Sequence, residues 1–122
     1  MTKLQLAQTV WLNSYANELW AKYHTTFSGL NKFSCPKIVL NNRFSRTAGC
    51  NFQAKNTIDL AAKFFIKNHA EMLTIILPHE MAHQIDFNLN GPSEKSCGHG
   101  KKWCEIMVQL GLPANKYHSL EL

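Results

Sequence analysis

The chain has 122 residues, 45% hydrophobic and 17% charged, a composition that fits one folded domain over residues 1–122 and excludes a disordered protein. Its apolar runs are too short to span a membrane, and its N-terminus lacks the apolar stretch of a signal peptide. We therefore expect a cytoplasmic protein that has no membrane partner and keeps its four cysteines reduced.

The net charge of +5 is unevenly distributed along the chain. Residues 1–70 carry nine Lys and Arg against two acidic residues, a balance of +7, whereas residues 71–122 carry four against six, a balance of −2. Such an excess favours a polyanionic partner, above all DNA, although a solvated basic surface is the alternative. The eight basic candidates for this contact are Lys22, Lys32, Lys37, Arg43, Arg46, Lys55, Lys63 and Lys67.

The first half of the chain predicts one helix followed by a small sheet. Residues 4–24 place apolar and aromatic side chains three and four positions apart, which indicates an amphipathic helix. Residues 38–40, 48–54 and 56–60 read as short strands with a turn near Asn56. Because the last two strands are close in sequence, we expect a three-stranded, mostly antiparallel sheet and an α+β fold.

The second half predicts two helices. The first runs from about residue 69 to 89, with Asn68 and Glu71 as a capping pair and a stop at Gly91. Pro78 lies inside this helix and should kink it just before His79, or divide it in two. The second helix begins near residue 99 or 100 and ends at Gly111.

The most informative motif is His79-Glu80-Met81-Ala82-His83, which reads H-E-x-x-H within the first of these helices. Residues four apart share a helix face, so both imidazoles can reach one metal ion. Glu80 points too far round the helix to share that coordination easily, but it is well placed to hold a metal-bound water. This arrangement is typical of zinc hydrolases, in which the glutamate is the general base.

A catalytic zinc usually takes three protein ligands, so the motif leaves one ligand to find. The H-E-x-x-H subclass that continues with Gly at position 86 and His at position 89 is excluded, since this chain has Asp86 and Leu89 there. From the residues alone, His99 at the start of the last helix and Glu105 within it both remain candidates.

Several segments together resemble the SprT-like metalloprotease domain of bacterial SprT proteins and eukaryotic Spartan. The matches cover residues 36–122 and comprise Pro78–His83, His99-Gly100 with Trp103, Thr47-Ala48-Gly49 with Asn51-Phe52, Ile58–Leu60 and Tyr117-His118. The resemblance implies a small zincin-like domain with an N-terminal helix, an H-E-x-x-H helix and a C-terminal helix. It further implies one zinc per chain held by His79, His83 and His99, with Glu80 as the catalytic base. Many relatives also carry a C-terminal cysteine zinc-binding segment, which this sequence lacks.

Four further positions or segments are candidates for subsidiary roles. Tyr117 and His118 are candidate oxyanion donors or substrate contacts, and Asp86 is a candidate to orient a ligand imidazole. Ala48-Gly49-Cys50 is a candidate sheet edge for an extended substrate, with Gly49 permitting close backbone approach. Each also has a purely structural interpretation as a tail, a surface charge or a core strand.

The sequence therefore predicts a zinc-dependent endopeptidase that acts on DNA-associated or DNA-crosslinked proteins. A second hypothesis is a zinc-containing DNA- or protein-binding module with little or no turnover, and a third is a general peptidase without a nucleic-acid role. The intact Glu80 argues against the module, because a purely structural zinc site needs no general base. The sequence does not determine the oligomeric state.

Overall fold

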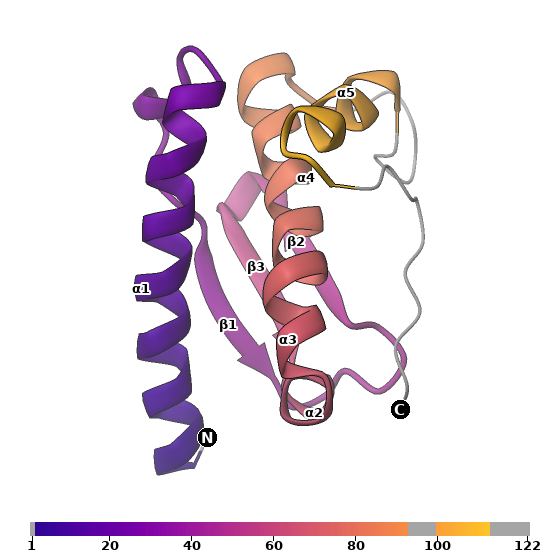
Figure 1. Cartoon of the computed structure of the whole chain (residues 1–122). Helices are drawn as coiled ribbons and strands as arrows, with labels where there is room; N and C mark the ends of the chain where they lie inside the picture. The colour runs from indigo at the N-terminus through magenta and orange to yellow at the C-terminus, as the bar shows by residue number, and fades with distance from the viewer. Residues whose placement is uncertain (1, 93–99, 113–122) are drawn as a thin grey trace.

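The computed structural model describes residues 2–92 and 100–112, and within these ranges the chain has an α+β fold. Its regular elements are α1 (Lys3–Thr26), β1 (Lys37–Asn41), β2 (Gly49–Phe52), β3 (Thr57–Ala61), α2 (Ala62–Lys67), α3 (His69–Glu71), α4 (Leu77–Asn90) and α5 (Lys101–Gln109). Short 3₁₀ turns lie at Leu30–Lys32 and Gln53–Lys55. In Figure 1, α4 crosses in front of the sheet, α1 runs alongside β1, and α5 packs on the far end of α4. Among the described residues no helix is both long and apolar enough to cross a bilayer.

The three strands form a mixed sheet in the order β1-β3-β2, so the expectation of a mostly antiparallel sheet was wrong. β2 and β3 form the predicted antiparallel pair, but β1 lies parallel to β3, with Ile38 opposite Ile58. The turn between β2 and β3 is short and sets their pairing locally. The place of β1 is set by burial instead, because Ile58 and Leu60 of the central strand are fully buried.

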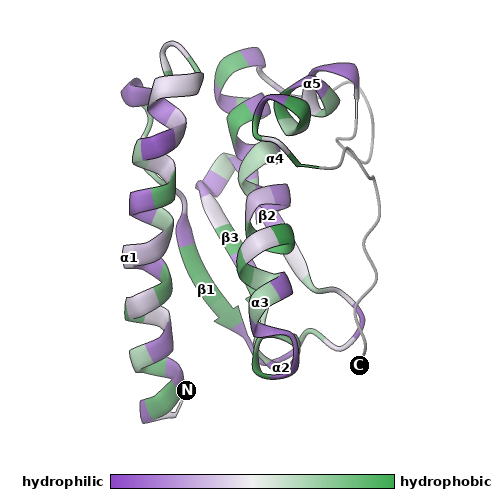
Figure 2. Ribbon diagram, viewed as in Figure 1, coloured by the Kyte–Doolittle hydropathy of each residue, from purple (hydrophilic) through white to green (hydrophobic). Residues whose placement is uncertain are grey.

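The outer edge of β1 is closed by α1 rather than by another strand. The side chain of Asn13 in α1 accepts a hydrogen bond from the Ile38 backbone N–H at 2.9 Å and donates one to the Ile38 carbonyl at 2.9 Å. One carboxamide thus satisfies both outward-facing backbone groups of Ile38. Hydrophobic residues run along most of β1 (Figure 2), and Leu12, Ala16 and Trp20 of α1 belong to the same core.

The helix predicted over residues 69–89 is confirmed in extent, but the disturbance at Pro78 takes another form. Between α3 and α4 the backbone forms a π-helix over Met72–Ile76, and the Leu77 N–H bonds to the Met72 carbonyl five residues back. A proline lacks the amide hydrogen and crowds the carbonyl four residues before it, and the wider π turn relieves both problems. Asn68 occupies the N-cap position without a side-chain cap hydrogen bond, so the predicted capping pair does not form.

The remaining boundaries agree with the sequence except for one short helix. α4 ends at Asn90, before Gly91 with φ of +81°, and α5 is followed by Gly111 with φ of +74°. The helix α2, directly after β3, was not predicted. Its six residues lack a side-chain cap, and burial of Phe64 and Phe65 stabilises it instead.

Candidate metal centre

The H-E-x-x-H motif occupies the first turns of α4, in a stretch that is buried throughout. Every residue from Leu77 to Asp86 is buried, and His79 and His83 expose only 4% and 8% of their surface. The two imidazole rings lie with their centroids 5.0 Å apart. Two imidazoles bound to one tetrahedral zinc at about 2.0–2.1 Å place their ring centres roughly 5 Å apart. The pair therefore fits two of the ligands of a zinc ion.

Glu80 is buried beside the imidazoles. Its Oε2 lies 3.9 Å from Nε2 of His79, and its side chain is 7% exposed. Burial raises the pKa of Glu80 to about 7, and a hydrogen bond donated by the Asn51 backbone N–H limits that rise. The Glu80 carboxyl group can therefore both accept and release a proton near neutral pH.

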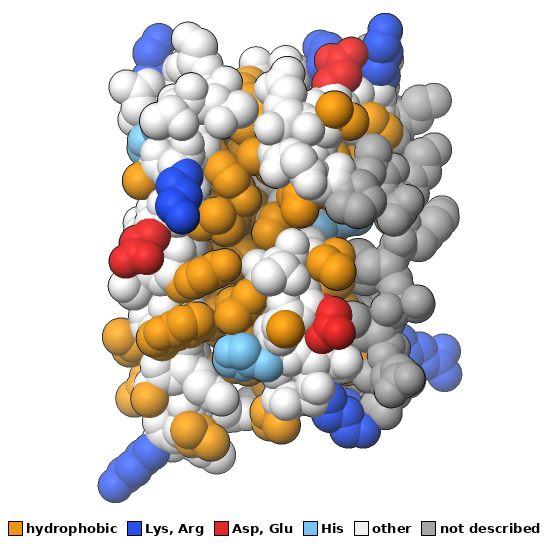
Figure 3. Space-filling model, in the orientation of Figure 1, with side chains coloured by type: hydrophobic (Ala, Val, Ile, Leu, Met, Phe, Trp, Pro, Cys, Tyr) orange, Lys and Arg blue, Asp and Glu red, His pale blue; other side chains and the backbone are white. Residues whose placement is uncertain are grey.

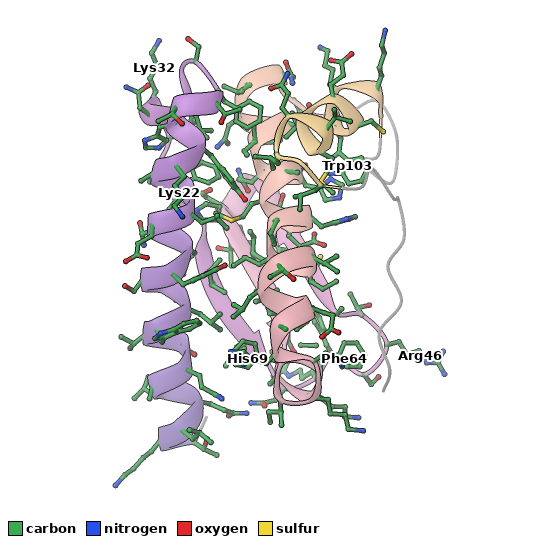
Figure 4. The ribbon with its side chains drawn as sticks, in the orientation of Figure 1. Lys22, Lys32, Arg46, Phe64, His69 and Trp103 are labelled. Atoms are coloured by element: carbon green, nitrogen blue, oxygen red, sulfur yellow. The ribbon has the colours of Figure 1, made fainter. Side chains whose placement is uncertain are left out.

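Trp103 of α5 packs against both imidazoles. Its ring stacks on His83 at 5.1 Å and 15°, and it meets His79 edge-on at 5.0 Å and 65°. Figure 4 shows Trp103 lying between α5 and α4, and the residue is fully buried. Aromatic contacts of this kind restrict the rotation of the rings that they touch. The sequence placed Trp103 only on the apolar face of the last helix and within the family pattern.

The candidate third ligand is not settled by the described part of the chain. Within residues 2–92 and 100–112, no group of three or more His, Cys, Asp or Glu could hold a metal ion. Glu105 is included in that range and is exposed on α5, so the described geometry does not support it as a ligand. His99, Tyr117 and His118 lie outside the described residues, and their roles remain predictions.

The predicted substrate edge, Ala48-Gly49-Cys50, lies next to Glu80. Ala48 is buried, and its carbonyl accepts a hydrogen bond from the Ala61 N–H at 2.8 Å, which pairs it with β3. A Cβ built on Gly49 would lie 3.0 Å from Cγ2 of Ile76 and 3.3 Å from Cγ of Glu80. Gly49 therefore lets β2 approach α4 more closely than any other residue type would.

Two further site candidates have defined surroundings. Burial raises the pKa of the Cys50 thiol, and the nearby Glu80 and Asp59 carboxylates raise it further. Asp86 is 6% exposed, and its Oδ1 accepts a hydrogen bond from Nδ2 of Asn90 at 2.8 Å, one turn further along α4. Orientation of a ligand imidazole by Asp86 remains a prediction.

A network of carboxamides beside the motif was not anticipated. Gln84, directly after His83, is 1% exposed and joins Asn51 and Gln53 on the strand side of the site to Asn88 on α4. One sequence signal pointed to it. Asn51 and Gln53 occupy alternate positions, so they share one face of the strand predicted over residues 48–54.

The chain belongs to the SprT-like family, whose model matches residues 16–118 and which is generally of metalloprotease type. This match confirms the resemblance found in the sequence. Protein SprT of Klebsiella pneumoniae subsp. pneumoniae is 32% identical over 92 residues, which cover 75% of this chain and 53% of that protein. Protein SprT of Vibrio parahaemolyticus is 33% identical over 91 residues, covering 74% and 53%.

Protein SprT of Actinobacillus succinogenes is 33% identical over 76 residues, which cover 62% of this chain and 43% of that protein. The chain thus spans about half the length of the curated relatives it matches. No solved structure matches the chain significantly.

Proposed function

We propose that this chain is a zinc-dependent endopeptidase that hydrolyses peptide bonds in DNA-associated or DNA-crosslinked proteins. The observation that supports it best is the buried pair of imidazoles 5.0 Å apart, with Glu80 between them in sequence, on one helix of a SprT-like chain. A buried carboxyl group and two buried imidazoles are costly to keep in a core, and a cation bound by the imidazoles beside the carboxyl group would offset that cost.

In this proposal His79, His83 and His99 hold the zinc ion. When bound, zinc supplies Lewis acidity, which acidifies water and polarises a carbonyl group. Glu80 accepts the proton of the attacking water and returns it to the nitrogen of the leaving amine. Hydrogen bonding by the Asn51 N–H lowers the pKa of Glu80 and so favours the ionised form, which accepts a proton. Trp103 limits rotation of the two imidazoles and helps to exclude solvent.

The DNA part of the proposal is supported by how the basic residues group at one end of the fold. Since β1 and β3 are parallel, the segments that follow them leave the sheet at the same end. Gln5 of α1 donates a hydrogen bond to Asn42 at 2.7 Å, which brings the start of α1 there as well. The basic residues of these segments are Lys3, Arg43, Arg46, Lys63 and Lys67.

The other basic candidates do not join this group. Lys37 and Lys55 flank the opposite end of β1 and β3, and Figure 4 shows Lys32 at the far end of the molecule from Arg46. Several Lys and Arg side chains of the face seen in Figure 3 also lie towards its two ends, with hydrophobic side chains between them. We therefore assign DNA contact to the end that carries Arg43, Arg46, Lys63 and Lys67.

The direct test is cleavage of a basic DNA-binding protein, free and crosslinked to a duplex, by zinc-loaded wild type and Glu80→Gln. We expect cleavage by the wild type alone, faster on the crosslinked protein at low salt. Double charge reversal, Arg43→Glu with Arg46→Glu, should remove the advantage of DNA and reduce its salt dependence. DNA or protein binding by a zinc-loaded wild type that cleaves nothing would favour the binding module instead.

A further inference from the structure

We propose that Gln84 is a positioning residue, which clamps strand β2 to helix α4 so that the Asn51 backbone N–H stays on the Glu80 carboxylate. The inference rests on the proposed function, in which Glu80 transfers protons. It assigns a role to a side chain that touches neither the metal ligands' ring nitrogens nor the reacting atoms.

Gln84 has the surroundings of a structural clamp. Its Oε1 accepts a hydrogen bond from Nδ2 of Asn51 at 2.8 Å, and its Nε2 donates to the Gln53 carbonyl at 3.2 Å and to Oδ1 of Asn88 at 2.9 Å. A carboxamide that is 1% exposed is stabilising only if its polar atoms are bonded in this way. Three of its four hydrogen-bonding positions are used, two of them to reach the strand side.

A second tie runs in the opposite direction. Nε2 of Gln53 donates to the backbone carbonyl of His83 at 3.2 Å, so the segment after β2 is fixed to the turn that bears one imidazole. Asn51 also donates from Nδ2 to the Thr57 carbonyl at 3.2 Å, which joins the clamp to β3. Strand, turn and helix are therefore held by the same small group of amides.

The register of the sheet explains why this clamp matters for Glu80. The Ala48 carbonyl bonds to the Ala61 N–H, and bonded pairs alternate along an antiparallel ladder. The backbone groups of Gly49 and Asn51 consequently face away from β3, along the outer edge of the sheet. There the Asn51 N–H faces the Glu80 carboxylate, and its hydrogen bonding lowers the pKa of Glu80.

The spacing between strand and helix leaves little tolerance for movement. The position of a Cβ on Gly49 lies 3.3 Å from Cγ of Glu80, so β2 and α4 are in close contact at this point. A shift of β2 away from α4 would therefore move the Asn51 N–H away from the Glu80 carboxylate. Gln84 and Gln53 oppose that shift from one turn further along the helix.

The test compares Gln84→Met, which keeps the side-chain length but cannot form these hydrogen bonds, with Gln53→Met, which removes only the second tie. The matched control is Asn13→Ala, which removes the carboxamide that holds the other edge of the sheet. Two quantities are measured: the ¹H shift of the Asn51 backbone amide in metal-free protein, and kcat and KM of the zinc-loaded protein. Glu80→Gln gives the reference shift for an Asn51 amide without its carboxylate acceptor.

We expect Gln84→Met to move the Asn51 amide upfield towards its Glu80→Gln position and to lower kcat by up to about 100-fold, with KM less affected. Gln53→Met should change the Asn51 amide shift and kcat in the same direction but by less. Asn13→Ala should change neither the shift nor kcat. A Gln84→Met protein that folds and keeps the wild-type amide shift would overturn the inference. If Gln84→Met fails to fold, a Gln53→Met protein that keeps the wild-type Asn51 amide shift would also overturn the inference. If the wild type cleaves nothing, the proposed function fails, but the amide shift still decides the clamp.

Discussion

Side-chain carboxamides close both edges of the sheet, but they have different roles at the two edges. At β1, the carboxamide of Asn13 bonds both outward-facing groups of Ile38, and a hydrophobic core lies behind it. At β2, the carboxamides of Asn51 and Gln84 bond each other, and an outward-facing backbone N–H is left to a buried carboxylate. One edge is thus closed against the core, whereas the other is closed beside a buried carboxylate, to which we assign a catalytic role.

Removal of the carboxylate at the β2 edge should have the largest effect. Glu80→Gln keeps the shape of the side chain but cannot accept the proton of water, so kcat should fall between about 100-fold and 10,000-fold. Zinc content and thermal stability should stay close to the wild type. Steady-state kinetics beside metal analysis check this, and cleavage at the wild-type rate would remove Glu80 as the base.

A methyl group at Gly49 should have the next largest effect. In Gly49→Ala the added Cβ lies 3.0 Å from Ile76 Cγ2 and 3.3 Å from Glu80 Cγ, closer than most such contacts. β2, Ile76 or Glu80 must give by a few tenths of an ångström. Because a misplacement of about 1 Å costs roughly 100-fold in rate, kcat should fall by less than that factor. The matched control is Gly29→Ala, since a Cβ there meets nothing within 4 Å, and its strained φ of +88° affects only a distant turn. Equal kcat in both variants would contradict the close approach.

At the β1 edge the expected effect is on stability and not on activity. Asn13→Ala leaves the N–H and carbonyl of Ile38 without their partner, which should lower the free energy of unfolding by about 1–3 kcal/mol. Because β1 lies on the far side of β3 from the candidate centre, kcat should not change. Chemical denaturation and steady-state kinetics on one preparation measure both. A loss of kcat without a loss of stability would contradict the purely structural role of Asn13 at the β1 edge.

The smallest expected effects concern the thiols beside each edge. Cys35, two residues before β1, is held by burial at a pKa of about 12, well above the ordinary thiol value of about 8.5. The folded state therefore keeps a proton that the unfolded state releases, so the stability contributed by Cys35 is full below about pH 8.5 and is lost as the pH rises towards 12. Cys35→Ala should unfold with a weaker dependence on pH over this range.

The rates of alkylation should also distinguish Cys50 from Cys35. The Glu80 and Asp59 carboxylates add to burial in raising the pKa of Cys50, whereas burial is the cause at Cys35. In metal-free Glu80→Gln, Cys50 should react faster with iodoacetamide than in the wild type at the same pH, and Cys35 should not. Peptide mapping of the modified sites measures each rate, and an unchanged Cys50 rate would place Glu80 too far away to act on it.

The sequence predicted those parts of the fold that depend on local patterns. Apolar spacing predicts helix α4, and glycines predict where α4 and α5 end. A short turn predicts the β2–β3 pair. The parallel placement of β1 depends on which strand is buried most deeply, and that is a property of the whole core. The π turn ahead of Pro78 is likewise a compromise between a proline and the packing of the residues around it.

The candidate site divides in the same way. The spacing of His79, Glu80 and His83 is local, and their place on α4 agrees with the predicted helix, whereas their burial was not predicted. The contacts of Trp103 with both imidazoles and the clamp around Gln84 join segments that lie 20 residues or more apart, so no single motif contains them. These contacts depend on how the strand and the two helices pack together, which only the folded chain defines.

The zinc content of purified variants shows whether α4 holds the metal. Purified wild type, Glu80→Gln, and the double variant His79→Ala with His83→Ala are each saturated with zinc, desalted and analysed for bound metal. We expect one zinc per chain in the wild type and in Glu80→Gln, and none in the double variant. Retention of one zinc per chain by the double variant, while it remains folded, would show that α4 does not hold the metal.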